Sequence, residues 1–116
     1  MKIKLIVSIV ALFALVALAT GTNNTYTVTA YCSCVKCCGK WSANNKTADG
    51  HTPVQGVTCA ASRKIPFGTK LLINGHVYTV QDRLATKYDS RIDIYFTNHL
   101  DAVKWGKKKL EVEIVK

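Results

Sequence analysis

Two carboxylates are the residues of this sequence best suited to acid–base chemistry. Asp82 lies in the alternating run HVYTVQD, and Asp93 lies in the alternating run RIDIYF. Alternation of apolar and polar residues is typical of half-buried strands, so we expect both acids on neighbouring strands at one end of a small β domain. Two such acids would form a site for general acid–base catalysis. The alternative is a pair of solvated charges at strand ends.

The N-terminal segment has the pattern of an export signal. Lys2 and Lys4 precede an apolar run over 5–18, and Ala17-Leu18-Ala19 is a small-x-small cleavage sequence. The run is shorter than the roughly 20 residues that cross a bilayer. We therefore predict a cleaved signal peptide over 1–19, a linker over 20–24 and one domain over 25–116, in a secreted or cell-wall-associated protein without a remaining membrane span. A retained N-terminal anchor is the alternative.

The chain is strongly basic. Sixteen Lys and Arg residues against seven Asp and Glu give a net charge of +9, and removal of Lys2 and Lys4 lowers it to +7. Export argues against nucleic acid as the partner, so an anionic cell-wall polymer or an acidic membrane surface fits this charge better. A generic solvated basic surface is the alternative. A single domain of this size is expected to be a monomer.

Five cysteines form the second chemically active set. Four of them crowd together and the fifth stands alone: Cys32, Cys34, Cys37, Cys38 and Cys59. In an exported chain we predict disulfides, with no metal and no cofactor, and because five is odd one thiol stays free or pairs with another molecule. The Cys34-x-x-Cys37 spacing also suits a zinc knuckle with Cys32 and Cys59, which is the alternative. The histidines share no metal-ligand spacing and are expected at the surface: His51, His76 and His99.

Short alternating segments dominate the chain after the signal. Asn74-Gly75 between two of them indicates a type I′ hairpin, because both central residues of that turn need positive φ. Asn98 has the character of an N-cap for a short helix over 98–105, with Leu100 and Val103 facing inward and Gly106 ending it. Six short strands and one short helix predict a mainly β, closed or nearly closed barrel. The expected strands are 25–31, 57–61, 70–73, 76–81, 91–96 and 110–115.

An ordered series of motifs resembles the bacterial 3D domain, a family named for three aspartates and similar to the C-terminal part of MltA-type lytic transglycosylases, to stationary-phase muralytic proteins and to RlpA-like barrels. The matching segments are Thr29-Ala30-Tyr31, Thr47-Ala48-Asp49-Gly50, IPFGTK over 65–70, Val80-Gln81-Asp82, RIDIYF over 91–96 and AVKWG over 102–106.

The resemblance implies a six-stranded double-psi β barrel that cleaves the β-1,4 bond between N-acetylmuramic acid and N-acetylglucosamine in peptidoglycan. It implies that Asp93 is the catalytic acid and base and that Asp82 is its acidic partner. The predicted substrate-binding residues are Tyr31, Thr47, Gly50 and Arg91.

One position departs from the family pattern and keeps other functions open. Ala61 or Ser62 stands where the family has its first aspartate, before the Pro-x-Gly-Thr turn. This replacement favours a non-catalytic module that binds or loosens the cell wall, as expansin-like barrels do. A third possibility is a secreted, disulfide-rich scaffold protein that uses the barrel only as a framework.

Overall fold

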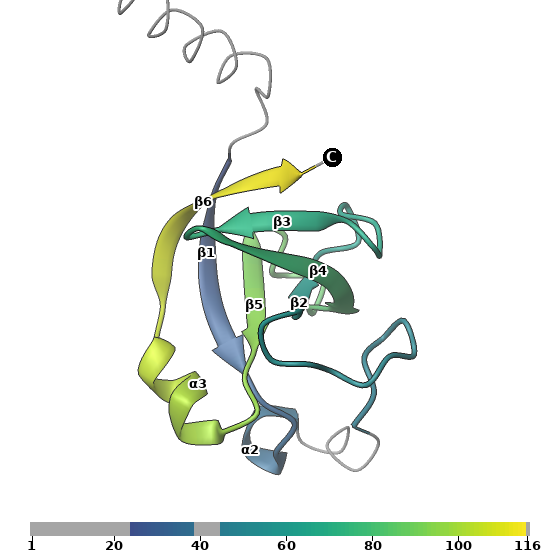
Figure 1. The fold of residues 1–116 in the computed structure, drawn as a ribbon, viewed down its shortest axis with the longest axis vertical. Helices are drawn as coiled ribbons and strands as arrows, with labels where there is room; N and C mark the ends of the chain where they lie inside the picture. The colour runs from purple at the N-terminus through teal and green to yellow at the C-terminus, as the bar shows by residue number, and fades with distance from the viewer. Residues whose placement is uncertain (1–23, 39–44, 116) are drawn as a thin grey trace, which may run out of the picture.

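Six short strands close into a barrel in the computed structural model, which describes residues 24–38 and 45–115 (Figure 1). The order around the barrel is β1-β5-β2-β4-β3-β6. The mainly β, six-stranded prediction is therefore confirmed, and each predicted strand is present to within two residues at either end. The strands are β1 (Asn24–Tyr31), β2 (Thr58–Ala61), β3 (Lys70–Ile73), β4 (His76–Arg83), β5 (Arg91–Tyr95) and β6 (Lys108–Val115).

The core of the barrel is built from the apolar residues of the alternating strands. Because successive side chains point to opposite faces of a strand, one apolar set from each strand faces inward. These branched side chains are at most 2% exposed, and their removal from water is the main favourable contribution to folding. They are Val28, Leu71, Ile73, Val80, Ile92, Ile94 and Val112.

Strand pairing does not follow the order of the chain. β1 pairs with β5 and β2 pairs with β4 in parallel, whereas the other neighbours are antiparallel. As a result β2 lies between β4 and β5, and its Ala60 is paired with both Asp82 and Asp93. The expectation that the two acids lie on neighbouring strands is therefore wrong, because a strand from earlier in the chain is inserted between them.

The β3–β4 hairpin has the predicted turn. Asn74 and Gly75 have φ values of 53° and 79°, as both central residues of a type I′ turn require. This turn sets the register in which Ile73 faces His76. The local prediction is confirmed because a two-residue turn depends almost entirely on its own residues.

Helix α3 (His99–Trp105) begins and ends as predicted but presents a different face to the barrel. The Asn98 side chain accepts hydrogen bonds from the backbone N–H groups of Leu100 and Asp101, and Gly106 ends the helix with a φ of 72°. The expected inward residues are wrong, since Leu100 is 65% exposed and Val103 is 61% exposed.

The inward face of α3 consists of Ala102 and Trp105 instead. Ala102 is 5% exposed, and the Trp105 ring packs on Phe96 while its indole N–H donates to the Val28 carbonyl at 3.2 Å. A tryptophan can bury more apolar area than a leucine or valine, and burial of its N–H requires a hydrogen-bond acceptor. Burial of the Trp105 ring and the hydrogen bond of its N–H together explain why this face of α3 is turned toward the barrel.

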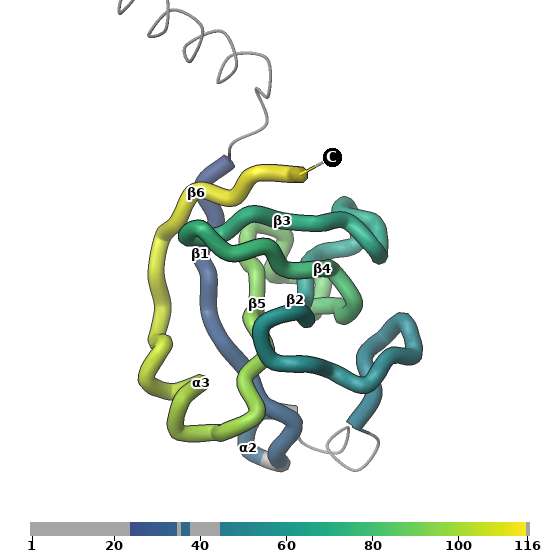
Figure 2. The backbone as a smooth tube through the Cα atoms, viewed as in Figure 1, coloured from purple at the N-terminus to yellow at the C-terminus, as the bar shows by residue number. Residues whose placement is uncertain are grey.

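A single helical turn, α2 (Val35–Cys38), follows β1 and lies beside α3 at one pole of the barrel (Figure 2). No helix within 24–38 and 45–115 is long and apolar enough to cross a membrane. The predicted signal peptide over 1–19 and the linker up to residue 23 lie outside the described residues, and β1 begins at Asn24, one residue before the predicted domain boundary.

Candidate functional site

A cleft of about 670 Å³ opens on the barrel wall where β4 and β5 flank β2. Both predicted catalytic acids line this cleft, together with the predicted substrate-binding residues Tyr31 and Thr47. The other two predicted binding residues, Gly50 and Arg91, are not among its lining residues. The topology therefore brings together side chains from β1, β4, β5 and the loop after residue 45.

Asp93 is a largely buried carboxyl in the cleft wall, with its side chain 20% exposed. The hydroxyl of Thr29, its register partner on β1, donates to Asp93 Oδ1. Arg91 Nε lies 4.0 Å from the same oxygen and donates to Thr29 Oγ1 at 3.0 Å. Burial raises the pKa of Asp93, the positive charge of Arg91 offsets part of that rise, and the negative charge of Asp82 adds to it.

Asp82 is held as a hydrogen-bond acceptor on both of its oxygens. The Tyr31 hydroxyl donates to Oδ2 at 2.8 Å. The backbone N–H groups of Ala48 and Arg83 donate to Oδ1 at 3.0 Å and 2.9 Å. Three donors hold the Asp82 carboxylate in one orientation within the cleft wall.

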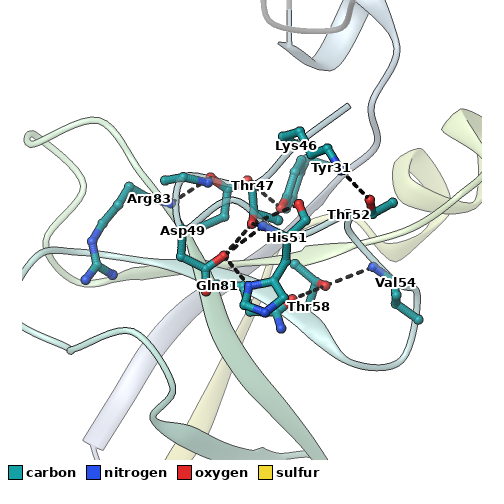
Figure 3. A network of polar contacts seen from close by, with 12 residues as sticks. Tyr31, Lys46, Thr47, Asp49, His51, Thr52, Val54, Thr58, Gln81 and Arg83 are labelled. Atoms are coloured by element: carbon teal, nitrogen blue, oxygen red, sulfur yellow. Dashed lines mark hydrogen bonds and ion pairs between the residues drawn. The ribbon is translucent and has the colours of Figure 1, made fainter. Parts of the chain in front are cut away.

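The loop over 47–51 is a compact turn that contributes Thr47 and Ala48 to the cleft. Figure 3 shows the polar contacts that join Thr47, Asp49 and His51 in this turn. The Thr47 hydroxyl donates to Asp49 at 2.5 Å and accepts from the His51 N–H at 3.0 Å. Burial alone would raise the pKa of Asp49, but hydrogen bonds from Thr47 and His51 outweigh it and lower that pKa. Gly50 adopts a φ of 91°, so its place in this motif is explained by the turn itself.

Arg83 and Tyr88 also line the cleft, although the sequence did not indicate them as binding residues. The Arg83 guanidinium lies over the Phe67 ring at 3.8 Å, and its Nη1 is buried with no hydrogen-bond partner among the described residues. Tyr88 lines the cleft and has the Arg91 guanidinium 4.5 Å from its ring centre. Their positions in the sequence could have indicated a place in the site, because Arg83 directly follows Asp82 and Tyr88 lies in the loop between the two acids.

The position at which the resemblance predicts a first aspartate does not contribute to the cleft. Ala61 and Ser62 are buried, at 0% and 4% exposure, and neither is among the cleft-lining residues. The Ser62 hydroxyl accepts a hydrogen bond from the Lys64 N–H at 3.3 Å and so helps to form the turn that follows. No third acid approaches Asp82 and Asp93 from this position.

The cysteines divide into a cluster at the pole of the barrel and one core residue. Cys32 Sγ lies 3.0 Å from Cys34 Sγ and 3.1 Å from Cys37 Sγ, which is longer than the S–S bond of about 2.05 Å. The predicted disulfides are therefore not formed between these pairs. Cys59 is a free cysteine, 0% exposed, and burial raises its pKa to about 12. The side chain of the fifth candidate, Cys38, lies outside the described residues.

The histidines meet different environments. His51 contacts Asp49 at 2.8 Å and is 61% exposed, and His76 is also exposed, so the surface prediction is confirmed for both. His99 is half-buried and not fully at the surface as predicted, and its Nδ1 lies 3.2 Å from Cys34 Sγ. The contact joins residues 65 positions apart in the sequence, a separation at which spacing rules for metal ligands give no signal.

Neither the family models nor the curated proteins with which the sequence was compared gave a match.

Proposed function

We propose that this chain is an exported, peptidoglycan-active enzyme that cleaves the bond between N-acetylmuramic acid and N-acetylglucosamine by lytic transglycosylation. The observation that carries the proposal is Asp93, a mostly buried carboxyl with a raised pKa that lines a cleft shared with Asp82. A general acid at a glycosidic bond must keep its proton near neutral pH, and burial beside a second carboxylate favours the protonated form. The signal-like N-terminus and the basic composition suit work in an anionic cell wall.

In this reaction Asp93 does the work of both acid and base. Its protonated carboxyl first gives its proton to the glycosidic oxygen, and the bond to the muramyl anomeric carbon breaks. The resulting carboxylate then takes the proton of the muramyl 6-hydroxyl as that oxygen attacks the anomeric carbon. A 1,6-anhydro sugar forms, Asp93 is protonated again, and no water is consumed. Asp82 supports the first step through its charge.

The different surroundings of the two acids suit a mechanism with one catalytic carboxyl. Tyr31, Ala48 and Arg83 occupy Asp82 with hydrogen bonds, which makes it a fixed charge instead of a nucleophile. The Tyr88 ring lines the cleft and is suited to a sugar face of the glycan.

A non-catalytic wall-binding module is the second candidate. The specific observation in its favour is that Ala61 and Ser62 are buried and bring no acid to the cleft. If Asp82 serves only to fasten the 47–51 loop and Tyr31, the same cleft binds a glycan strand without cleaving it. Both candidates take peptidoglycan as partner, and they differ only in whether Asp93 transfers a proton.

Digestion of purified peptidoglycan separates the two candidates. The chain without residues 1–19 is incubated with the polymer, and the soluble products are analysed by mass spectrometry. Release of 1,6-anhydro-muropeptides that stops in Asp93→Ala supports the enzyme. Cosedimentation with the polymer without any new product contradicts the enzyme and supports the binding module.

A further inference from the structure

Four ligand-type side chains converge at the pole of the barrel, outside the acidic pair. They are Cys32, Cys34, Cys37 and His99, and their donor atoms all lie within 4.8 Å of one another. The distances from His99 Nδ1 to the three sulfurs are 3.5 Å, 3.2 Å and 3.5 Å, in that order. Cys32 directly follows β1, Cys34 directly precedes α2, Cys37 lies within α2, and His99 is the first residue of α3. Figure 1 shows α2 and α3 at the same pole of the barrel.

These separations are close to the edges of a tetrahedral zinc site. With Zn–S bonds of about 2.3 Å and a Zn–N bond of about 2.0 Å, the nitrogen–sulfur edges are roughly 3.5 Å and the sulfur–sulfur edges roughly 3.8 Å. The distances from His99 Nδ1 to the three sulfurs therefore already match those expected around a bound zinc ion. The Cys32–Cys34 and Cys32–Cys37 separations of 3.0 Å and 3.1 Å need to lengthen by less than an ångström. A disulfide would use only two of these four groups.

The donor set selects the kind of ion. Three thiolates and one imidazole are soft ligands that suit zinc and disfavour magnesium or calcium, which prefer oxygen. Four protein ligands complete a tetrahedron and leave no open position for a substrate, as in structural zinc sites. The Cys34-x-x-Cys37 segment has the ligand spacing of a zinc knuckle, and the Cys37 N–H donates to the Cys34 carbonyl at 3.1 Å to close it.

The fold positions the fourth ligand through α3. Asn98 caps the helix directly before His99, and Trp105 fastens the other end of the same helix to the Val28 carbonyl of β1. Both ends of α3 are thus held, and His99 is brought to the sulfurs by the start of the helix. Because the Asn98 cap and the Trp105 hydrogen bond hold both ends of the short helix α3, the position of the His99 imidazole is defined by the fold itself.

We propose that Cys32, Cys34, Cys37 and His99 form a structural zinc site that fastens α3 and the α2 turn to the end of β1. The proposal is independent of the function assigned to the cleft. The two sites share one wall, because Cys37 and the neighbouring Ser33 also line the cleft. Zinc binding would therefore hold one side of that cleft in place.

Metal titration of the full chain tests the proposal. The protein is prepared under reducing conditions and titrated with Zn²⁺ alone, and then with Co²⁺ alone, whose tetrahedral thiolate complexes have characteristic visible absorption. We expect one ion per chain. In Cys34→Ser and His99→Ala the affinity should fall by more than the roughly 10- to 100-fold that loss of an outer-shell contact costs. Bound zinc should raise the melting temperature of the native protein, and a chelator should reverse that rise.

Matched variants keep the test decisive. Cys59→Ala and His76→Ala change the same residue types outside the cluster and should keep the ion. His99→Cys supplies a fourth sulfur and should keep one ion per chain with a shifted cobalt spectrum, which separates loss of a ligand from loss of the fold. Failure to bind either ion, unchanged affinity in His99→Ala, or an equal loss in Cys59→Ala would each overturn the proposal.

Discussion

Asp82 and Asp93 lie on either side of Ala60, which is paired with both of them in the barrel wall. This arrangement gives the two acids a common cleft and different environments. Asp82 accepts hydrogen bonds from three groups of the protein, whereas Asp93 is buried beside Thr29 and Arg91. Two carboxyls in unlike surroundings are expected to have different roles, and the following predictions test that difference.

Replacement of the proposed acid should strongly slow cleavage while leaving glycan binding in place. In Asp93→Asn we expect the rate of anhydro-muropeptide release to fall about 10²- to 10⁴-fold, the usual contribution of a general acid–base residue. The matched control is Asp89→Asn, since Asp89 is exposed and pairs only with Lys64 at 3.1 Å among the described residues. An equal loss in both variants, or none in Asp93→Asn, contradicts the assignment.

The pH dependence of cleavage should respond in opposite directions to two charge changes. The rate depends on protonated Asp93, so it falls as the pH rises through the pKa of that residue. Arg91→Gln removes a charge that lowers this pKa and should move the fall in rate to higher pH. Asp82→Asn removes a charge that raises it and should move the fall to lower pH. The measurement is kcat/KM against pH on soluble glycan fragments, and a shift in the same direction for both variants would refute the electrostatic account.

The same pKa determines how Asp93 contributes to stability. The pKa of Asp93 is higher in the folded protein than in the unfolded chain. The contribution of Asp93 to the free energy of unfolding is therefore fully present at pH values below its unfolded pKa. It is lost as the pH rises through the folded pKa. Asn is neutral and resembles the protonated carboxyl. The difference in unfolding free energy between Asp93→Asn and the native protein should therefore favour the variant more at neutral pH than at acidic pH. Urea unfolding at several pH values checks this, and a pH-independent difference would disprove it.

The hydrogen bond between Tyr31 and Asp82 should be visible as coupling in stability. A hydrogen bond to a charged group contributes about 1.5–3 kcal/mol, and partial exposure of this pair places the expected value near the lower end. Tyr31→Phe, Asp82→Asn and the double variant form a cycle whose unfolding free energies isolate the interaction. Simple additivity of the two single changes would mean that the pair does not fasten β1 to β4.

The orientation of α3 predicts unequal effects at two apolar positions. Trp105→Phe leaves the Val28 carbonyl without its indole donor and should lower the free energy of unfolding by about 1–3 kcal/mol. Leu100→Ala changes a side chain that is 65% exposed and should stay within about 0.5 kcal/mol. Thermal and urea unfolding measure both. A larger cost for Leu100→Ala would instead support the helix face that the sequence pattern predicts.

The sequence by itself determined the features that depend on neighbouring residues. Period-two alternation placed the strands, because side chains on a strand alternate between its faces whatever lies opposite. Asn74-Gly75 specified its own turn, and Asn98 capped α3 through its own side chain. The two acids were identified by their places on alternating runs.

Only the tertiary structure decided which of these parts meet. Insertion of β2 between β4 and β5 separated the acids and placed Ala60 between them. The rotation of α3 followed from Trp105 finding an acceptor on β1, a contact between residues 77 positions apart. His99 reached the cysteines across 65 positions in the same way. Such contacts depend on how the whole chain closes into a barrel, and a local pattern contains no information about that closure.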